Sequence, residues 1–502
     1  MLYRFFPLCV LIACLAGIAT QVRAQALTTL PQVVEHAVLN NPEILTRFNS
    51  FQASLEAQGV QRGGLLPQVD VQGGYGKEWR NATDTDPITW NRPTYRLEVR
   101  QLLFDGLSLR NSVRQLGFQK LSSYYELLAA VDSVALEAVD AYLDVQRYRE
   151  MTRLASDNFR IHEHTLKLLR DRQTSGVGRG VDLQQAIGRM ALAQTNLITE
   201  TNNLNDVTQR YIRIVGQPPA ENLAPAPDVS DQLPSRPANF ADALRTNPGV
   251  LAKQALVQAA EASRAAARGR FSPTLELRAS TGRDRDVSSS NVQSTTAQLV
   301  LNYNLYRGGA DSARLRQAAA EQYAARDVRN YTCRNAQQEL SVTWNNIARL
   351  QYQLPFLRTH RDAMSKVRVA AEQQFQIGQR SLLDLLNTSN ELFDARRALL
   401  NGEYDLAQRR LRWLALSHRV LPALGLAQPH EQAPEEAAEL AFSDDALAAC
   451  LAPAPDTRNL QPVQITYGEG LQPPTLTPLA APAASSPKPP STAGPGSAPT
   501  IR

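Results

Sequence analysis

The residues best suited to chemistry in this sequence follow two turns that contain glycine. The glycines concerned are Gly176, Gly178, Gly180 and Gly378. Clustered glycines can cradle a phosphate when a strand precedes them and a Lys-Ser or Lys-Thr pair follows, but neither condition holds here. These glycines therefore predict turns. Asp182 and Asp384, which follow them, are acids at the start of a helix, where a carboxylate offsets the helix dipole.

Other residue types that often serve catalysis do not form a catalytic pattern. His162 and His164 are two positions apart on an expected helix, so their side chains point about 200° apart and cannot bind one ion together. A Ser-His-Asp hydrolase would need a nucleophile elbow, and the sequence contains none. The sequence therefore indicates a protein that is not an enzyme and that needs no cofactor or metal.

The N-terminus has the pattern of a secretory signal. Arg4 precedes an apolar stretch, and small residues allow cleavage after Ala24 or after Ala26; the signal is assigned to residues 1–24. The stretch ending at Cys14 also resembles a lipoprotein box, but it would end the signal too early. Export leaves Cys333 and Cys450 as the cysteines of the mature chain. An oxidising compartment would permit a bridge between them, although two unpaired thiols are the expected state.

Charge and hydropathy exclude two classes of protein. The 53 basic and 48 acidic residues are spread along the chain and give a net charge of +5, with no basic patch interleaved with aromatics, so a nucleic-acid partner is not expected. After the N-terminus, no apolar run reaches the ~18 residues of a membrane helix. A helical membrane protein is thereby excluded.

The chain reads as one architecture used twice. Ala37, Asn41, Pro42 and Leu45 recur 206 residues later as Ala243, Asn247, Pro248 and Leu251. Farther along, the offset becomes 202, which places Gly106 on Gly308 and Asp182 on Asp384. Such self-similarity predicts two repeats, 25–217 and 238–420, with a linker at 218–237. Residues 421–502 are rich in alanine and proline and are expected to be a largely disordered tail.

Each repeat is expected to contain a strand hairpin, at about 66–104 and about 272–306. One face of the first carries Val69, Val71, Leu97, Val99 and Leu103, and the other carries Gln68, Asp70, Gln72, Arg96, Glu98 and Arg100. In the second hairpin, Leu275, Leu277, Leu299, Leu301 and Tyr303 oppose Thr274, Glu276, Arg278, Gln298, Asn302 and Asn304. Strands of about ten residues with this alternation suit either a tilted membrane strand or a soluble, half-buried hairpin.

A long helical hairpin is predicted after each pair of strands, at about 105–217 and about 307–420. No proline interrupts the chain between Pro93 and Pro218, so nearly continuous helix is expected from 105 to 174, on the order of 100 Å long. Such length suits a structure that bridges a compartment. In the second repeat, Pro355 predicts a kink or a change of helix.

The order of these features, and their duplication over about 27–420, resembles the TolC family of outer-membrane channel proteins. The shared features include Asn41-Pro42 with Asn247-Pro248, Phe104 to Gly106 with Tyr306 to Gly308, and the glycine turns. The resemblance implies an α+β membrane protein in the outer membrane: a homotrimer with a 12-stranded β-barrel, four strands per chain, continued by a long α-helical barrel in the periplasm. A barrel in lipid must close, which the strands of one chain cannot do.

The same resemblance implies a gate at the periplasmic tip of the tunnel. It gives Asp384 and Asp182 as acids of the entrance constriction, Arg380 and Phe375 as their partners, and Asn387 in place of a second acid. Gly176, Gly178, Gly180 and Gly378 would mark the tips that dock an adaptor. A narrow ring of carboxylates would select cations.

The function implied is that of a passive exit duct in a type I secretion system. Its partners would be a periplasmic membrane-fusion adaptor, an inner-membrane ABC-type transporter and outer-membrane lipid. Within the family, residues 100–106 and 176–182 look more like the secretion branch than the efflux branch. The alternatives are the outer-membrane component of a multidrug or metal efflux pump and, from another class, a periplasmic coiled-coil scaffold.

Overall fold

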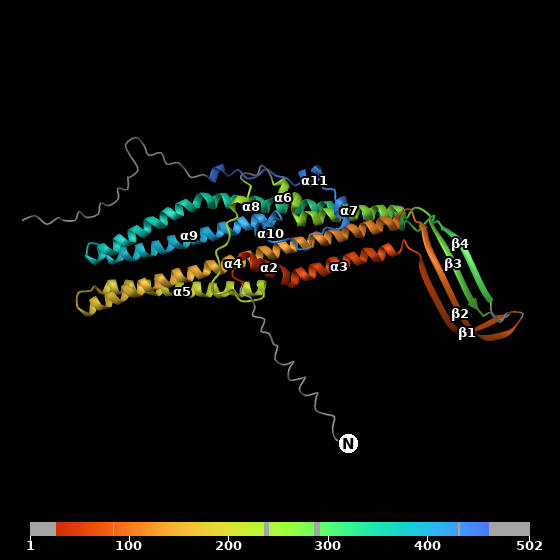
Figure 1. The fold of residues 1–502 in the computed structure, drawn as a ribbon, viewed down its shortest axis with the longest axis horizontal. Coiled ribbons are helices and arrows are strands. Elements are labelled where there is room, and N and C mark those ends of the chain that lie inside the picture. The colour runs from red at the N-terminus through yellow and green to blue at the C-terminus, as the bar shows by residue number, and fades with distance from the viewer. Residues whose placement is uncertain (1–26, 84, 235–239, 286–291, 430–431, 461–502) are drawn as a thin grey trace, which may run out of the picture. The chain divides into compact units, whose positions relative to one another are not determined.

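The computed structural model describes residues 27–83, 85–234, 240–285, 292–429 and 432–460. Within these residues the chain forms a four-stranded antiparallel sheet at one end of two long helical hairpins, whose turns lie at the opposite end (Figure 1). No helix among them is both long and apolar enough to cross a membrane. The predicted signal, at residues 1–24, lies outside the described residues.

The sheet follows the chain order β1-β2-β3-β4. Its strands are β1 (Gln68–Ala82), β2 (Thr85–Phe104), β3 (Thr274–Asp284) and β4 (Val292–Asn302). The predicted pairing of polar with polar and apolar with apolar residues is confirmed, because Val69 lies opposite Val99 and Asp70 lies opposite Glu98. One face of the sheet is therefore apolar and the other charged.

The first hairpin covers the predicted range, but β1 and β2, with 15 and 20 residues, are longer than the about ten residues predicted for each strand. The two strands remain paired through Gly76 and Arg92 almost to the tip of the hairpin. The prolines of β2 do not prevent this, because the pairing of β2 with β3 ends at Thr94. Beyond that point, a proline without an N–H group removes no hydrogen bond on the β3 side.

Two helical hairpins follow the strands. The helices are α4 (Ser108–Thr174) with α5 (Gly180–Val215), and α8 (Ala310–Gln376) with α9 (Leu382–Leu416). Both α4 and α8 contain 67 residues, about 100 Å at 1.5 Å per residue, as expected for the first of them. The predicted change of helix at Pro355 is wrong, because α8 runs through it. Pro355 lies on the exposed side, where the carbonyl that it leaves unbonded can reach water.

Shorter helices flank the hairpins and explain the Asn-Pro pairs. They are α2 (Leu30–Asn40), α3 (Pro42–Gly63), α6 (Ala241–Thr246) and α7 (Pro248–Gly269). The Asn41 and Asn247 side chains accept hydrogen bonds from Glu43 N and Val250 N, and the proline occupies the first helical position. Each pair therefore ends one helix and begins the next.

The main hydrophobic core joins both halves of the chain around α4. Tyr142 is fully buried, and its hydroxyl donates to the Thr28 and Ala224 carbonyls, which holds the N-terminal segment and the linker against α4. Val229 from the linker and Leu340 from α8 belong to the same core. The predicted linker is therefore packed over its described part, residues 218–234.

The expectation of a disordered tail from residue 421 is wrong for its described part. Residues 420–460 include α10 (Val420–Ala423), η2 (Glu435–Glu439), α11 (Asp444–Ala448) and η3 (Thr457–Leu460). Leu447 and Cys450 are buried in the main core, and Cys450 is joined to Cys333 by a disulfide bond. The expectation of two unpaired thiols is therefore also wrong. The tail beyond residue 460 lies outside the described residues.

Candidate functional site

The two hairpin turns carry the glycines that the sequence singled out. Gly176 and Gly378 have φ angles of +76°, which glycine adopts without strain, and each lies just after a long helix. A Cβ atom at Gly178 would lie 2.8 Å from the Gln173 backbone N, whereas at Gly180 it would meet nothing within 4 Å. Turn geometry therefore explains Gly176, Gly178 and Gly378, while Gly180 is the first residue of α5.

Asp384 and Asp182 occupy the first turns of α9 and α5. Ser381 caps α9 by accepting from Asp384 N at 3.2 Å, and Arg380 Nε lies 4.0 Å from the Asp384 carboxylate. Asp384 is exposed, so this local pair contributes little to stability. The exposed carboxylate lies at the tip of the hairpin, available to a neighbouring group.

Phe375 belongs to an apolar cluster that joins the two hairpins just behind their turns. The cluster consists of Leu166, Leu169, Ala186, Ala371, Phe375, Leu382, Leu385 and Leu386. The Arg172 guanidinium of α4 lies 5.3 Å from the centre of the Phe375 ring of α8. Phe375 thus links the first hairpin to the second through both apolar and cation–π contacts.

Asn387, which the sequence predicted to replace a second acid of the entrance, bridges the two hairpins. Its side-chain oxygen accepts a hydrogen bond from Arg189 of α5 at 2.8 Å. A groove of about 440 Å³ opens beside this bond, lined in part by Arg189, His360, Asn390 and Asp394. Asn387 therefore acts here as a neutral acceptor between helices.

His162, which the sequence analysis excluded as a metal ligand together with His164, forms the next contact between the hairpins. It is 1% exposed, and its Nε2 lies 3.1 Å from the Asn390 side-chain oxygen of α9. Burial lowers the pKa of His162 below its ordinary value of 6.5, a shift that the hydrogen bond to Asn390 only partly opposes. The neutral form of the ring is therefore favoured, and the tautomer with its proton on Nε2 donates to the Asn390 oxygen.

Acidification is expected to loosen this contact. As the pH falls below 6.5, the unfolded chain gains a proton at His162 that the buried ring resists, so stability present above pH 6.5 is lost as the pH falls. Once exchange rates are divided by the intrinsic rate at each pH, the amides of residues 158–166 and 386–394 should be less protected at pH 5.5 than at pH 7.5. His162→Gln, which cannot titrate, should remove that difference, and an equal difference in the variant would contradict the assignment to His162.

Farther from the turns, α5 and α9 are joined by an ion pair whose carboxylate is buried and whose guanidinium is 38% exposed. The Glu200 side chain is 5% exposed and lies 2.8 Å from the Arg397 guanidinium, while Asn203 donates to its other oxygen. Removing the Arg397 guanidinium would leave the Glu200 carboxylate buried without a cation. The resulting loss of folding stability exceeds the stability that the intact pair contributes. Glu200 and Arg397 were missed in the sequence, since nothing local pairs residues 197 positions apart.

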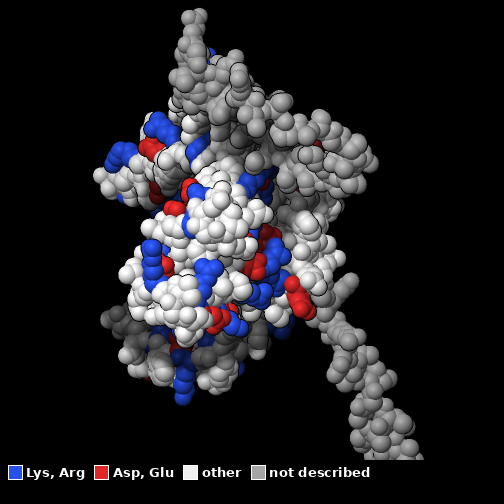
Figure 2. Space-filling model, turned by 90° about the vertical axis from the view of Figure 1, so that its left-hand side faces the viewer, with Lys and Arg blue, Asp and Glu red and all other residues white. Residues whose placement is uncertain are grey.

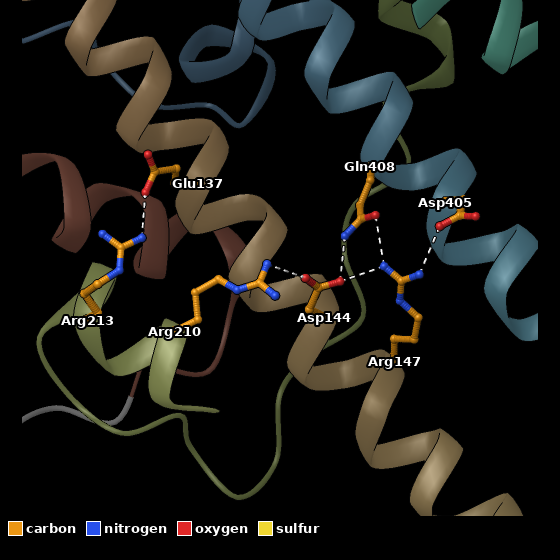
Figure 3. A network of polar contacts seen from close by, with 7 residues as sticks. All are labelled: Glu137, Asp144, Arg147, Arg210, Arg213, Asp405 and Gln408. Carbon is orange, nitrogen blue, oxygen red and sulfur yellow. Dashed lines mark hydrogen bonds and ion pairs between the residues drawn. The ribbon is translucent and has the colours of Figure 1, made fainter. Parts of the chain in front are cut away.

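A larger ion cluster near the middle of α4 joins α4, α5 and α9 (Figure 3). Asp144, with a side chain 10% exposed, accepts from Arg147, from Arg210 of α5 and from Gln408 of α9. Arg147 also reaches Asp405 at 3.0 Å. Asp144 therefore has hydrogen-bond partners from α4, α5 and α9, and it holds the three helices together at this level.

One neighbouring acid has a strongly shifted pKa. Burial raises the pKa of Asp140 to about 6, and the nearby Asp144 carboxylate adds to the effect, against the opposing influence of Arg412. The carboxyl is therefore partly protonated just below neutral pH.

Viewed toward the hairpin turns, the surface carries basic and acidic side chains interspersed with uncharged ones (Figure 2). Because the two signs of charge are mixed, this face as a whole attracts neither acidic nor basic partners preferentially. Recognition at the tips therefore depends on individual groups. Among the described residues, no group of three or more His, Cys, Asp or Glu side chains is placed so that it could hold a metal ion.

The fold defines a class of protein. The crystal structure of the outer-membrane protein VceC from Vibrio cholerae is similar, with a TM-score of 0.68 at 18% identity, over 79% of this chain and 96% of that one. The sheet and the paired long hairpins of this chain therefore share the fold of that outer-membrane protein.

The model of the outer membrane efflux protein family matches residues 33–217 and 240–416, and the chain belongs to that family. The outer membrane efflux protein BepC of Brucella suis is 27% identical over 78% of this chain and 86% of its own length. The outer membrane protein TolC of Salmonella enteritidis is 25% identical, over 78% and 81%. The alkaline protease secretion protein AprF of Pseudomonas aeruginosa is 23% identical, over 76% and 82%.

Membership confirms three expectations from the sequence. The protein resembles TolC, it is a transport conduit and not an enzyme, and it is located in the outer membrane with its helical tunnel in the periplasm.

Proposed function

We propose that three copies of the chain form a closed channel through the outer membrane. Within one chain, β1 and β4 are the edges of the sheet, and an open edge in lipid leaves backbone groups without hydrogen bonds. Three four-stranded sheets supply the twelve strands of a closed barrel. The apolar face, with Val71 and Leu299, then meets lipid, and the charged face lines water.

The observation that most strongly supports this proposal is the charged face of the sheet. Arg100 pairs with Asp70 at 2.9 Å and Arg92 pairs with Glu78 at 2.7 Å, all on the face opposite Val69 and Val71. Exposed ion pairs on a membrane strand need water beside them, because charges cannot face the hydrocarbon core cheaply. A soluble coiled-coil scaffold, the alternative from another class, has no use for a lipid-compatible face opposite a charged one.

The closed end of this channel is proposed to be the hairpin tips. Asp384 and Asp182 would form the acidic entrance, with Arg380 beside Asp384, while Phe375 and Asn387 hold the two hairpins of a chain together. A periplasmic adaptor would dock at the turns marked by Gly176, Gly178, Gly180 and Gly378. Opening would then require the hairpins to separate at their tips, with loss of the Phe375 cluster and of the Arg189–Asn387 bond.

The proposed role is the exit duct of a type I secretion system, driven by an inner-membrane ABC-type transporter. The similarity to AprF, named for alkaline protease secretion, supports this branch. The similarity to BepC, named as an efflux protein, supports the second candidate, a multidrug or metal efflux pump.

Deleting the chain separates these two functions. Loss of a large protein from the culture medium, restored by the wild-type chain, with unchanged drug and metal tolerance, is expected for the secretion duct. Unchanged protein export with increased sensitivity to drugs or metals would contradict secretion and support efflux. Comparison of the whole secreted protein fraction makes the test independent of knowing the cargo.

A further inference from the structure

The described C-terminal segment 432–460, here called the C-terminal strap, is bound to both halves of the chain. On the first half, Glu436 lies 2.8 Å from Lys120 of α4 and accepts from Gln58 of α3. A Cβ atom at Gly117 would lie 2.7 Å from both Gln58 and Glu436, so α4 leaves room for the strap at this point. Ala437 and Leu440 pack on the cluster around Phe118.

The strap then crosses to the second half. The Gln254 side chain of α7 donates to the Ala441 carbonyl, and Arg245 of α6 pairs with Asp444. On α8, Gln337 donates to the Ala452 carbonyl at 3.0 Å. These contacts span α3, α4, α6, α7 and α8, so the strap connects helices that belong to different halves.

The far end of the strap is fixed covalently. Cys450 and Cys333 of α8 have a Cα–Cα distance of 5.7 Å, within the range of disulfides, and are 117 residues apart. Both are enclosed, with 5% and 1% exposure. The loop that the bond closes contains all of α9, and a long closed loop favours the folded chain by restricting the unfolded one.

We propose that Cys333 and Cys450 are a substrate site for a disulfide-donating oxidoreductase of the periplasm, and that this oxidation fastens the strap across the two halves. The thiolate of one cysteine attacks the donor's disulfide and forms a mixed disulfide with release of one donor thiolate. The thiolate of the other cysteine then attacks the sulfur of the first cysteine, which forms the Cys333–Cys450 bond, breaks the mixed disulfide and releases the donor's second thiolate. The chain loses two protons and two electrons, and the donor leaves as a dithiol.

The burial of both sulfurs sets the order of events. A donor cannot reach thiols that are enclosed to this degree, so the exchange precedes closure of the core around Cys450. The periplasmic location of the helices supplies an oxidising compartment. Assembly of the protein thus depends on a redox step that is independent of what the channel transports.

Peptide mapping of the full-length protein tests the proposal. After digestion without reductant, the peptides containing Cys333 and Cys450 should be linked in protein from cells with an active periplasmic disulfide donor, and free in protein from cells lacking it. Free thiols at both positions in the first strain would overturn the assignment. Equal linkage in both strains would overturn the role of the donor.

A second measurement tests the strap and needs no knowledge of the donor. In the double variant Cys333→Ser, Cys450→Ser, protease cleavage within 432–460 should be about tenfold faster or more, relative to cleavage within α9. Gln337→Ala, which removes one strap hydrogen bond and keeps the disulfide, is the matched control and should be nearly unaffected. Equal cleavage rates in the double variant and wild type would overturn the fastening role.

Discussion

Replacing Gly269 with alanine is expected to prevent correct assembly of the protein in the outer membrane. A Cβ atom at this last residue of α7 would lie 2.6 Å from the Gly106 carbonyl oxygen and 2.9 Å from the Ser108 backbone N. Both are backbone atoms, which cannot rotate away as a side chain can. The junctions β2–α4 and α7–β3 would have to separate, at a cost of roughly 3 kcal/mol. Loss of the heat-modifiable oligomer on gels would report it.

Gly63→Ala is the matched control for this prediction. Gly63 is the last residue of α3 and lies 206 positions before Gly269, at the repeat-equivalent site, but a Cβ atom there would meet nothing within 4 Å. Alanine should be tolerated or slightly stabilising, by up to about 1 kcal/mol, because it favours helix more than glycine does. Equal loss of oligomer in the two variants would contradict the close approach at Gly106.

Replacing Arg397 with methionine is expected to weaken the closed state of the tunnel. The substitution leaves Glu200 as a buried carboxylate without its cation, a loss on the order of 3–5 kcal/mol. Helices α5 and α9 should then separate more readily above the tips. Increased sensitivity of cells to a large hydrophilic antibiotic, with normal amounts of protein in the outer membrane, would report a leaking channel.

Arg358→Met provides the comparison for Arg397→Met. Arg358 pairs with Glu403 at 3.0 Å between α8 and α9, with side chains 54% and 42% exposed. Water screens this pair, so its loss should amount to less than about 1 kcal/mol. Equal leakage through both variants would indicate that burial of Glu200 does not matter to closure.

Much of the fold could be predicted because its determinants are local. The alternation of Val69 and Val71 with Asp70 gave the two faces of the sheet, and the absence of proline gave the length of α4. Asn41 and Asn247 could be recognised as helix boundaries because proline follows each. These patterns act within a few residues of the chain.

The errors arose where distant contacts override local patterns. The strap has the composition of a disordered tail, but Glu436 and Cys450 are held by Lys120 and Cys333, which lie far away in the sequence. Strand β2 continues through Pro93 because only one of its sides is paired there within the chain. Neither result follows from composition or propensity.

The candidate site could be predicted only in part. The turns and their acids were evident from Gly378 and Asp384, but the contacts of His162 with Asn390 and of Glu200 with Arg397 were not. In a long amphipathic helix, a buried polar residue has no local signature until its partner helix is known. The cross-hairpin contacts therefore came from the structure alone.

Planar-bilayer conductance of the purified oligomer tests the central claim most directly, that the chain forms a channel whose narrow entrance is acidic. Wild type should give small, cation-selective steps, and the double variant Asp384→Ala, Asp182→Ala should give larger or less selective ones. Equal steps from both proteins would keep the channel and contradict the acidic gate. No steps from either protein would contradict the channel itself and favour the scaffold.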